Sequence, residues 1–270
     1  MVLIIVGLLA AGILVGQDLI KAAAVRAQIA QIQKYNTAAN AFYQKYGGLP
    51  GDLSDPIATQ FGFVSRGTLP GQGDGNGLLQ GNCGGTCASG HAVAGGETVT
   101  FWTDLSTANM IDGSFTFDAE TACLPVTTGT SSVSFQAYYP AAKLGNGNYV
   151  YLSSGMSPYT AFNVFLIGAL VTIPAGCAAD SINPGVTVSQ AYNIDKKLDD
   201  GLPGTGIVFV SYNPNLTDYV ANNSIGVAGA STTCYDNGST PYGTFQYSMG
   251  QNNGAGVNCS PNIKLQAGSQ

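Results

Sequence analysis

The 270-residue chain carries unusually little charge. Asp, Glu, Lys and Arg make up 9% of its residues, whereas globular domains average roughly 25%. Only nine Lys and Arg are present and the net charge is −6, which argues against a nucleic-acid partner because phosphates need cations. Disorder driven by charge is excluded, since 45% of the residues are hydrophobic. A surface solvated mainly by Ser, Thr, Asn and Gly suits the outside of a cell better than the cytosol.

Side chains for acid–base catalysis are scarce as well. His91 is the only histidine, and a solvated loop histidine is a simpler interpretation of it than a Ser–His–Asp triad. Glu97 and Glu120 are the only glutamates. Asp favours turns and caps, whereas Glu favours helix surfaces. Because histidine and glutamate are so scarce, we expect no enzymatic activity. Because glutamate, which favours helix surfaces, is scarce, we also expect the chain beyond its first fifty residues to be mostly strand and loop.

The N-terminal segment is apolar without interruption from Met1 to Gly16. It is shorter than the ~20 residues that span a bilayer. It also lacks the basic start and the small-residue cleavage site of a signal peptide. The run continues directly into a helical pattern, so we expect the natural chain to extend upstream of Met1.

From Leu19 onward the pattern becomes amphipathic. Apolar or small residues recur at steps of three and four on one helix face, whereas Gln28 and most other polar residues lie off it. The members of this face are Val25, Ile29, Ile32, Asn36, Ala39, Tyr43 and Tyr46. Gly47 and Pro50 end the pattern, which predicts one helix over residues 1–46, ~69 Å long. We divide the chain into an apolar half-helix, 1–20, and a globular domain, 21–270, that includes the amphipathic half 21–46.

Because residues 1–20 are apolar all round, they must enter lipid or pack on other copies of the chain. A plain single-pass anchor is one interpretation. Gly7, Gly12 and Gly16 favour another, because each glycine weakens a helix by ~1 kcal/mol and is useful where a helix packs closely or unwinds.

The segment 2–53, with the stretch KYNTAANAFYQKYGGLPGDL, resembles the N-terminal helix of type IV pilins and type II secretion pseudopilins. It is most similar to large prepilin-like proteins with a KYNTAxNxFxxKYGxLPGD stretch. Residues 101–113 and 191–206 resemble two later elements of the same proteins. The family's leader with its peptidase site, and its glutamate near the mature N-terminus, would both lie upstream of Met1 when the chains are aligned on Gly7.

The resemblance implies a structural subunit that polymerises into an extracellular filament on a bacterial cell surface. It implies identical subunits as partners, the inner membrane as the site before assembly, and a pilus or secretion assembly machine. The side chains expected to pack in the filament core are Leu3, Ile4, Ile5, Leu8, Leu9, Ile13 and Leu14, with Gly7, Gly12 and Gly16 allowing local melting. Two alternatives stay open: a pseudopilin that acts as a periplasmic piston, and a pilus-tip adhesin with a pilin stalk. The adhesin would need exposed aromatic residues, for which Tyr235, Tyr242, Phe245 and Tyr247 are the candidates.

The fold class predicted for the whole chain is α+β, with the long N-terminal helix packed on an antiparallel sheet with long, disulfide-stapled loops, as in type IV pilins. Residues 54–98 are predicted to form a Gly-rich loop, and the chain after Pro214 is rich in Asn, Gly and Ser to its end. Helices are expected over 100–111 and over 188–198, the second with Thr187 as N-cap. Strands are expected over 132–138, 148–152, 161–172 and 207–212.

Six cysteines follow the apolar helix: Cys83, Cys87, Cys123, Cys177, Cys234 and Cys259. An even number in a surface-type chain favours disulfides, although six cysteines allow 15 connectivities. Pairing of sequence neighbours closes the shortest loops and is our first choice. Zinc is the less favoured alternative, because Cys83-x₃-Cys87 stands alone without a second ligand pair.

We expect no catalytic or cofactor-binding residues, and only weak candidates for a calcium site. Asp195, Asp199 and Asp200 could offer oxygen ligands on one turn, although acidic residues before Gly201 are also typical of a helix end. The sequence GQGDGNG at 71–77 resembles a calcium loop superficially but contains too few acids.

Overall fold

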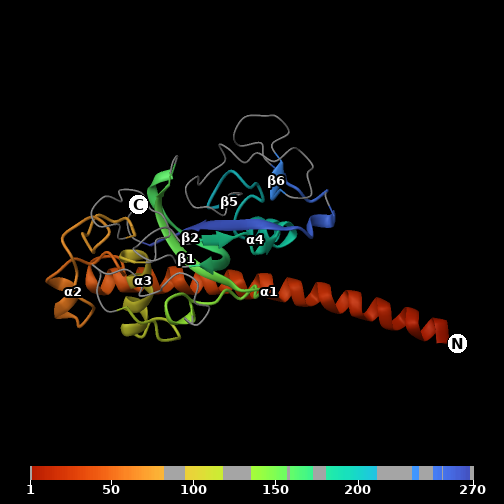
Figure 1. Ribbon diagram of the computed structural model, residues 1–270, viewed down its shortest axis with the longest axis horizontal. Helices are drawn as coiled ribbons and strands as arrows, with labels where there is room; N and C mark the ends of the chain where they lie inside the picture. The colour runs from red at the N-terminus through yellow and green to blue at the C-terminus, as the bar shows by residue number, and fades with distance from the viewer. Residues whose placement is uncertain are drawn as a thin grey trace.

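A computed structural model describes residues 2–81, 95–117, 135–156, 159–172, 181–211, 233–236, 246–250 and 252–267. Helix α1 (Val2–Tyr46) runs along one side of the domain, and its N-terminal end projects away from it (Figure 1). It ends as predicted at Gly47, which adopts φ 84° and donates its N–H to the carbonyl of Tyr43 at 2.8 Å. The left-handed conformation favours glycine because it has no Cβ.

The main sheet is antiparallel, so the described residues form an α+β fold with a long N-terminal helix. Strands β1, β2, β8 and β4 follow one another, β3 also pairs with β2, and β5 also pairs with β8. A second sheet pairs β6 with β7. The strands are β1 (Asn148–Met156), β2 (Tyr159–Thr172), β3 (Ser181–Asn183), β4 (Val186–Thr187), β5 (Val208–Ser211), β6 (Tyr235–Asp236), β7 (Gln246–Tyr247) and β8 (Val257–Lys264). The predicted strands at 148–152 and 161–172 are confirmed with small shifts of their ends. The strand predicted at 207–212 is confirmed over Val208–Ser211, and residue 212 lies outside the described residues.

Strand β8, which lies between β2 and β5, was not predicted. Its sequence, VNCSPNIK, has polar residues and a proline where a central strand normally has an apolar run. Pro261 is tolerated because its partner Val210 donates its N–H to the carbonyl of Pro203 at 3.1 Å instead of to β8. The lack of an N–H at Pro261 therefore breaks no hydrogen bond from β8 to β5.

Helix α4 (Val188–Leu198) begins and ends as predicted. Thr187 caps it, and a capping box joins Thr187 and Gln190. Helix α3 (Glu97–Thr107) begins and ends a few residues before the predicted 100–111. A short helix, α2 (Ile57–Gln60), lies inside the predicted loop 54–98. The predicted strand 132–138 is wrong at residues 135–137, because Phe135–Ala137 form a 3₁₀ turn, η1. A second such turn, η2, covers Asn252–Gly254.

The buried face of the amphipathic half of α1 is rotated about the helix axis relative to the predicted face. Its buried positions are Val25, Gln28, Ile32, Tyr35, Ala38, Ala39 and Phe42. Gln28 was expected off this face, but it is fully buried, and its Oε1 accepts a hydrogen bond from the N–H of Leu144 at 3.3 Å. Helix periodicity alone cannot reveal such a partner, since Leu144 is 116 residues away.

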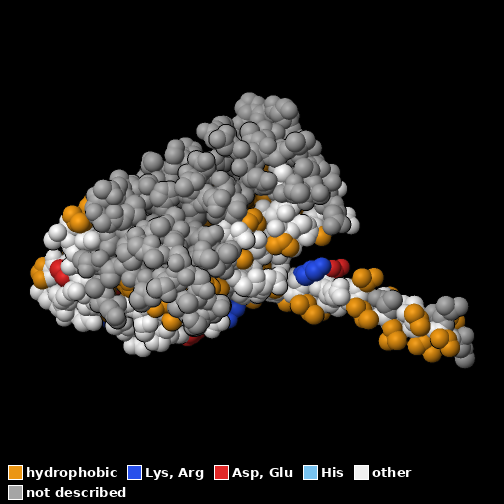
Figure 2. Space-filling view, in the orientation of Figure 1, with side chains coloured by type: hydrophobic (Ala, Val, Ile, Leu, Met, Phe, Trp, Pro, Cys, Tyr) orange, Lys and Arg blue, Asp and Glu red, His pale blue; other side chains and the backbone are white. Residues whose placement is uncertain are grey.

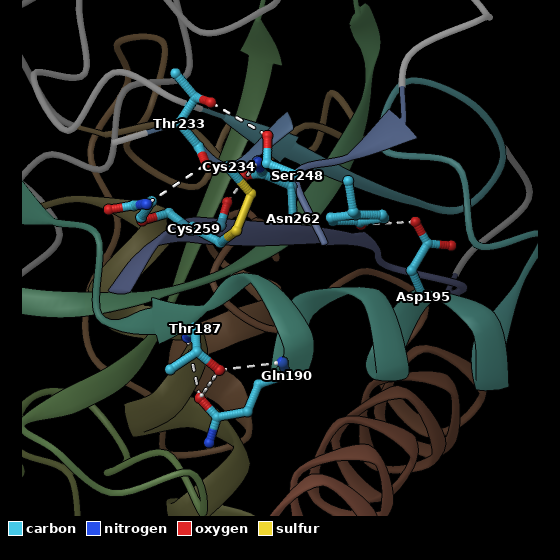
Figure 3. Close-up of a disulfide and its surroundings, with 11 residues drawn as sticks. Thr187, Gln190, Asp195, Thr233, Cys234, Ser248, Cys259 and Asn262 are labelled. Carbon is cyan, nitrogen blue, oxygen red and sulfur yellow. Dashed lines mark hydrogen bonds between the residues drawn. A yellow bond between two sulfur atoms is a disulfide. The ribbon is translucent and has the colours of Figure 1, made fainter. Parts of the chain in front are cut away.

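Helix α1 meets the sheet with the help of two other helices. It contacts α3 and α4, and α4 lies between β8 and α1 (Figure 3). The ring of Tyr35 packs edge-on against Trp102 of α3 at 4.9 Å and lies 6.1 Å from Phe165 of β2. This aromatic contact fixes the inner half of α1 to the domain.

Candidate functional site

The projecting end of α1 carries most of the large, exposed hydrophobic side chains among the described residues. Figure 2 shows hydrophobic side chains covering it. Its side chains are well exposed, for example Leu8 at 70% and Leu14 at 64%. The exposed members are Val2, Ile4, Ile5, Val6, Leu8, Leu9, Ile13, Leu14, Val15, Leu19 and Ile20. Monomeric soluble proteins rarely leave so many neighbouring large apolar side chains in water, so this surface is expected to be covered by lipid or protein.

The same segment is long and apolar enough to be a membrane anchor or signal. Its most apolar window has a mean hydropathy of 1.8, and 0% of that window is buried. Of the packing residues predicted here, Ile4, Ile5, Leu8, Leu9, Ile13 and Leu14 are all exposed. Leu3 lies on the helix, but its side chain is outside the described residues.

Gly7, Gly12 and Gly16 lie on this projecting segment, and apart from the adjacent residues and the backbone of the helix itself, no described atom lies within 4 Å of where a Cβ would be. Larger side chains would therefore fit in the isolated chain. Gly12 and Gly16 are four residues apart, so both lie on one helix face, where small residues let two helices approach closely. A requirement for glycine at these positions would have to come from outside the described chain.

The candidate calcium residues Asp195, Asp199 and Asp200 do come together, with oxygens within 4.8 Å of one another. Each is already engaged by hydrogen-bond donors. Asp195 accepts from the N–H of Gly201 at 3.0 Å and from the hydroxyl of Tyr247 at 2.7 Å (Figure 3).

Burial raises the pKa of Asp195 to about 7, while the hydrogen bonds from Tyr247 and Gly201 oppose the shift. The carboxylates of Asp199 and Asp200 accept from backbone N–H groups or hydroxyls of the following turn; the donors are Ile207 and Val208 for Asp199, and Leu202 and Thr205 for Asp200. The cluster joins the end of α4 to β5 and β7, and calcium at this place stays a prediction.

A second acidic cluster was not predicted. The loop 71–77 brings Asp74 close to Asp52 and Glu97, with oxygens within 4.8 Å of one another. The loop itself has too few acidic residues to resemble a calcium loop closely, but the other carboxylates come from the turn after α1 and from the first residue of α3. The one sequence feature that could have pointed to this cluster is Glu97, because it is one of only two glutamates in the chain.

The backbone of this loop surrounds the two buried carboxylates with donors. N–H groups of residues 73, 74 and 80 point to Glu97 at 2.7–3.4 Å, and those of residues 75, 76 and 77 point to Asp52 at 2.8–3.2 Å. Gly73, Gly75 and Gly77 adopt positive φ, and such alternation turns successive N–H groups toward one anion. Burial nevertheless raises the pKa of Asp52 to about 7. The loop is therefore anchored by the chain's own carboxylates.

The structure contains the predicted Cys234–Cys259 disulfide, with Cα atoms 5.0 Å apart (Figure 3). It links the segment entering β6 to the central strand β8. Cys83, Cys87, Cys123 and Cys177 lie outside the described residues, as does His91.

The aromatic residues proposed for an adhesin are only partly described. Tyr235 is 2% exposed and Tyr247 is 6% exposed, so both belong to the core and not to an exposed aromatic cluster. Tyr242 and Phe245 lie outside the described residues. The two described candidates, Tyr235 and Tyr247, therefore give the adhesin alternative no support.

Searches of family models, of curated proteins and of solved structures find no match to this chain.

Proposed function

We propose that the chain is a structural subunit of a cell-surface filament of the type IV pilin kind, polymerised through the apolar half of α1. The observation that carries this proposal is the continuity of α1. One helix of 45 residues is fixed in the domain at its C-terminal half and leaves its apolar half uncovered.

The energetics favour the helix as the polymerising element. About ten Leu, Ile and Val side chains, at roughly 1.5–3 kcal/mol each on burial, supply more free energy than contacts between weakly charged domain surfaces. In this proposal the segment lies in the inner membrane before assembly and in a bundle of helices afterwards. Low surface charge also suits close packing of subunits, because few charges have to be desolvated.

Deletion of residues 1–20 tests the proposal. The core begins at Val25, so the truncated chain is expected to be a folded, soluble monomer that forms no filaments. Sedimentation and negative-stain microscopy measure both properties. Filaments without residues 1–20 would show that the domains polymerise by themselves and would leave the helix as a plain anchor.

Two full-length double variants test whether filament formation depends on the apolar helix or on exposed apolar side chains anywhere in the chain. Leu8→Asp with Leu14→Asp should abolish filaments. Ile57→Asp with Leu69→Asp changes two residues of the domain that are each 42% exposed, and it should leave filaments intact.

The pseudopilin alternative shares the exposed helix and differs in the assembly that it builds. Microscopy of sheared surface material distinguishes the two. Long surface fibres composed of this chain support the pilus, and their absence from cells that express the chain supports the piston.

A further inference from the structure

A groove of about 580 Å³ runs beside the inner half of α1. Ala27 and Ala30 of α1 form part of its wall, and both are exposed. Phe115 and Tyr139, both buried, contribute the apolar lining on the side of the domain. Small residues on the helix and apolar rings beside them suit the approach of another helix.

The rim of the groove carries an excess of positive charge. Lys34 forms an ion pair with Asp112, and both side chains remain accessible to solvent, at 48% and 95%. The hydrogen bond and charge of Lys34 lower the pKa of Asp112, and the charge of Lys143 adds to the effect. Two lysines therefore share one carboxylate.

The backbone N–H of Lys143 donates to Oε1 of Gln31 at 3.1 Å. This bond places Lys143 beside α1 at the level of residue 31. Lys34, on α1, and Lys143, beside residue 31 of α1, therefore both lie next to the groove at defined positions along the helix.

The projecting half of α1 has the complementary charge. Asp18 is the only acidic residue of α1, it is exposed, and the described residues include no ion pair to it within 4.0 Å. Its neighbours on the helix include the exposed apolar residues Leu14, Val15 and Leu19 and, three residues further on, the exposed Lys21. A carboxylate buried among packed helices is costly unless a cation pairs with it.

We propose that this groove receives the stretch of α1 around Asp18 from a neighbouring copy of the chain, with Asp18 facing Lys34 and Lys143. The inference rests on the proposed function and adds the surface on which neighbouring subunits meet. Lys34 is sixteen residues beyond Asp18, and residue 31 is thirteen beyond it. At 1.5 Å per residue, parallel helices in contact here are offset along their axes by about 20–24 Å.

Zero-length carbodiimide coupling of assembled full-length chain tests the contact. Filaments grown from a mixture of isotopically light and heavy subunits are coupled, digested and analysed by mass spectrometry. Mixed light–heavy peptides joining Asp18 to Lys34 or Lys143 are expected, and detergent-dispersed monomer should give none. Coupling of Asp18 in filaments only to other lysines, such as Lys21, would overturn the inference while leaving the proposed function intact. Failure to form any filament would overturn both.

A charge swap gives an independent readout. Asp18→Lys should reduce filament yield at least tenfold, and adding Lys143→Asp should restore most of it. Lys197→Asp is the matched control, because Lys197 is exposed on α4 and does not line the groove. Equal recovery with both second changes, or none with Lys143→Asp, would contradict the proposed pairing.

Discussion

Arg66 and Asp104 form an ion pair that solvent does not reach: Nη2 lies 2.6 Å from Oδ2, and both side chains are 0% exposed. Asp104 also accepts the N–H of Gly51 at 2.7 Å, and Arg66 donates through Nε to the carbonyl of Leu53 at 2.9 Å. The pair therefore holds the turn that follows α1 against α3. Its position suggests that it stabilises the junction between the long helix and the domain.

Asp104→Ala should lower the free energy of unfolding by about 3–5 kcal/mol, because it leaves a buried guanidinium without its carboxylate. Lys34→Ala breaks the exposed pair with Asp112 and should lower the free energy of unfolding far less, because water screens that pair. Denaturant unfolding of the two variants measures the difference. Equal losses would show that Asp104 does not stabilise the domain through Arg66.

Asp195 should make the domain less stable as the pH rises. Its pKa is about 7 in the folded chain and near 3.8 otherwise. Between these values the folded state retains a proton that the unfolded state has lost, so the free energy of unfolding falls with increasing pH.

Asp195→Asn is the matched variant, since an amide can still accept from Gly201 and can donate to the oxygen of Tyr247. The stability of the original chain relative to this variant should decrease from pH 4 to pH 7. Thermal melts across this range measure it, and a constant difference would contradict the shift.

Replacing Cys234 and Cys259 by Ser together should lower the free energy of unfolding by about 3 kcal/mol, because the bridge spans a sequence separation of 25 residues. Reduction of the original chain should destabilise it at least as much, since the other four cysteines are expected to be oxidised. Mass spectrometry of unreduced protein checks that expectation, and free thiols or bound zinc would refute it.

Gly7→Leu with Gly12→Leu should leave the domain folded and reduce the number or length of filaments. Both positions are open in the isolated chain, and each change favours the helix by about 1 kcal/mol and opposes local melting. Ala11→Leu is the control, because it adds bulk nearby with little change in helix propensity. Normal filaments from the double variant would contradict a role for melting.

The sequence alone was sufficient for the elements whose causes are local. The end of α1 at Gly47, the start of α4 at Thr187 and the apolar runs of β1 and β2 follow from caps, periodicity and composition over a few residues. The exposure of the N-terminal half of α1 was also readable, because a helix that is apolar all round has no face to turn toward its own domain.

The tertiary structure decided what depends on partners far along the chain. β8 is a central strand although its sequence is polar, because β2 and β5 supply its ladder. Arg66 is buried because Asp104 and the carbonyl of Leu53 satisfy it. The loop 71–77 closes on Asp52 and Glu97 instead of standing alone. In each case a polar group can be buried without a large cost in free energy only when its hydrogen-bond or charge partner is in place. The fold, and not the neighbouring residues in the sequence, determines that partner.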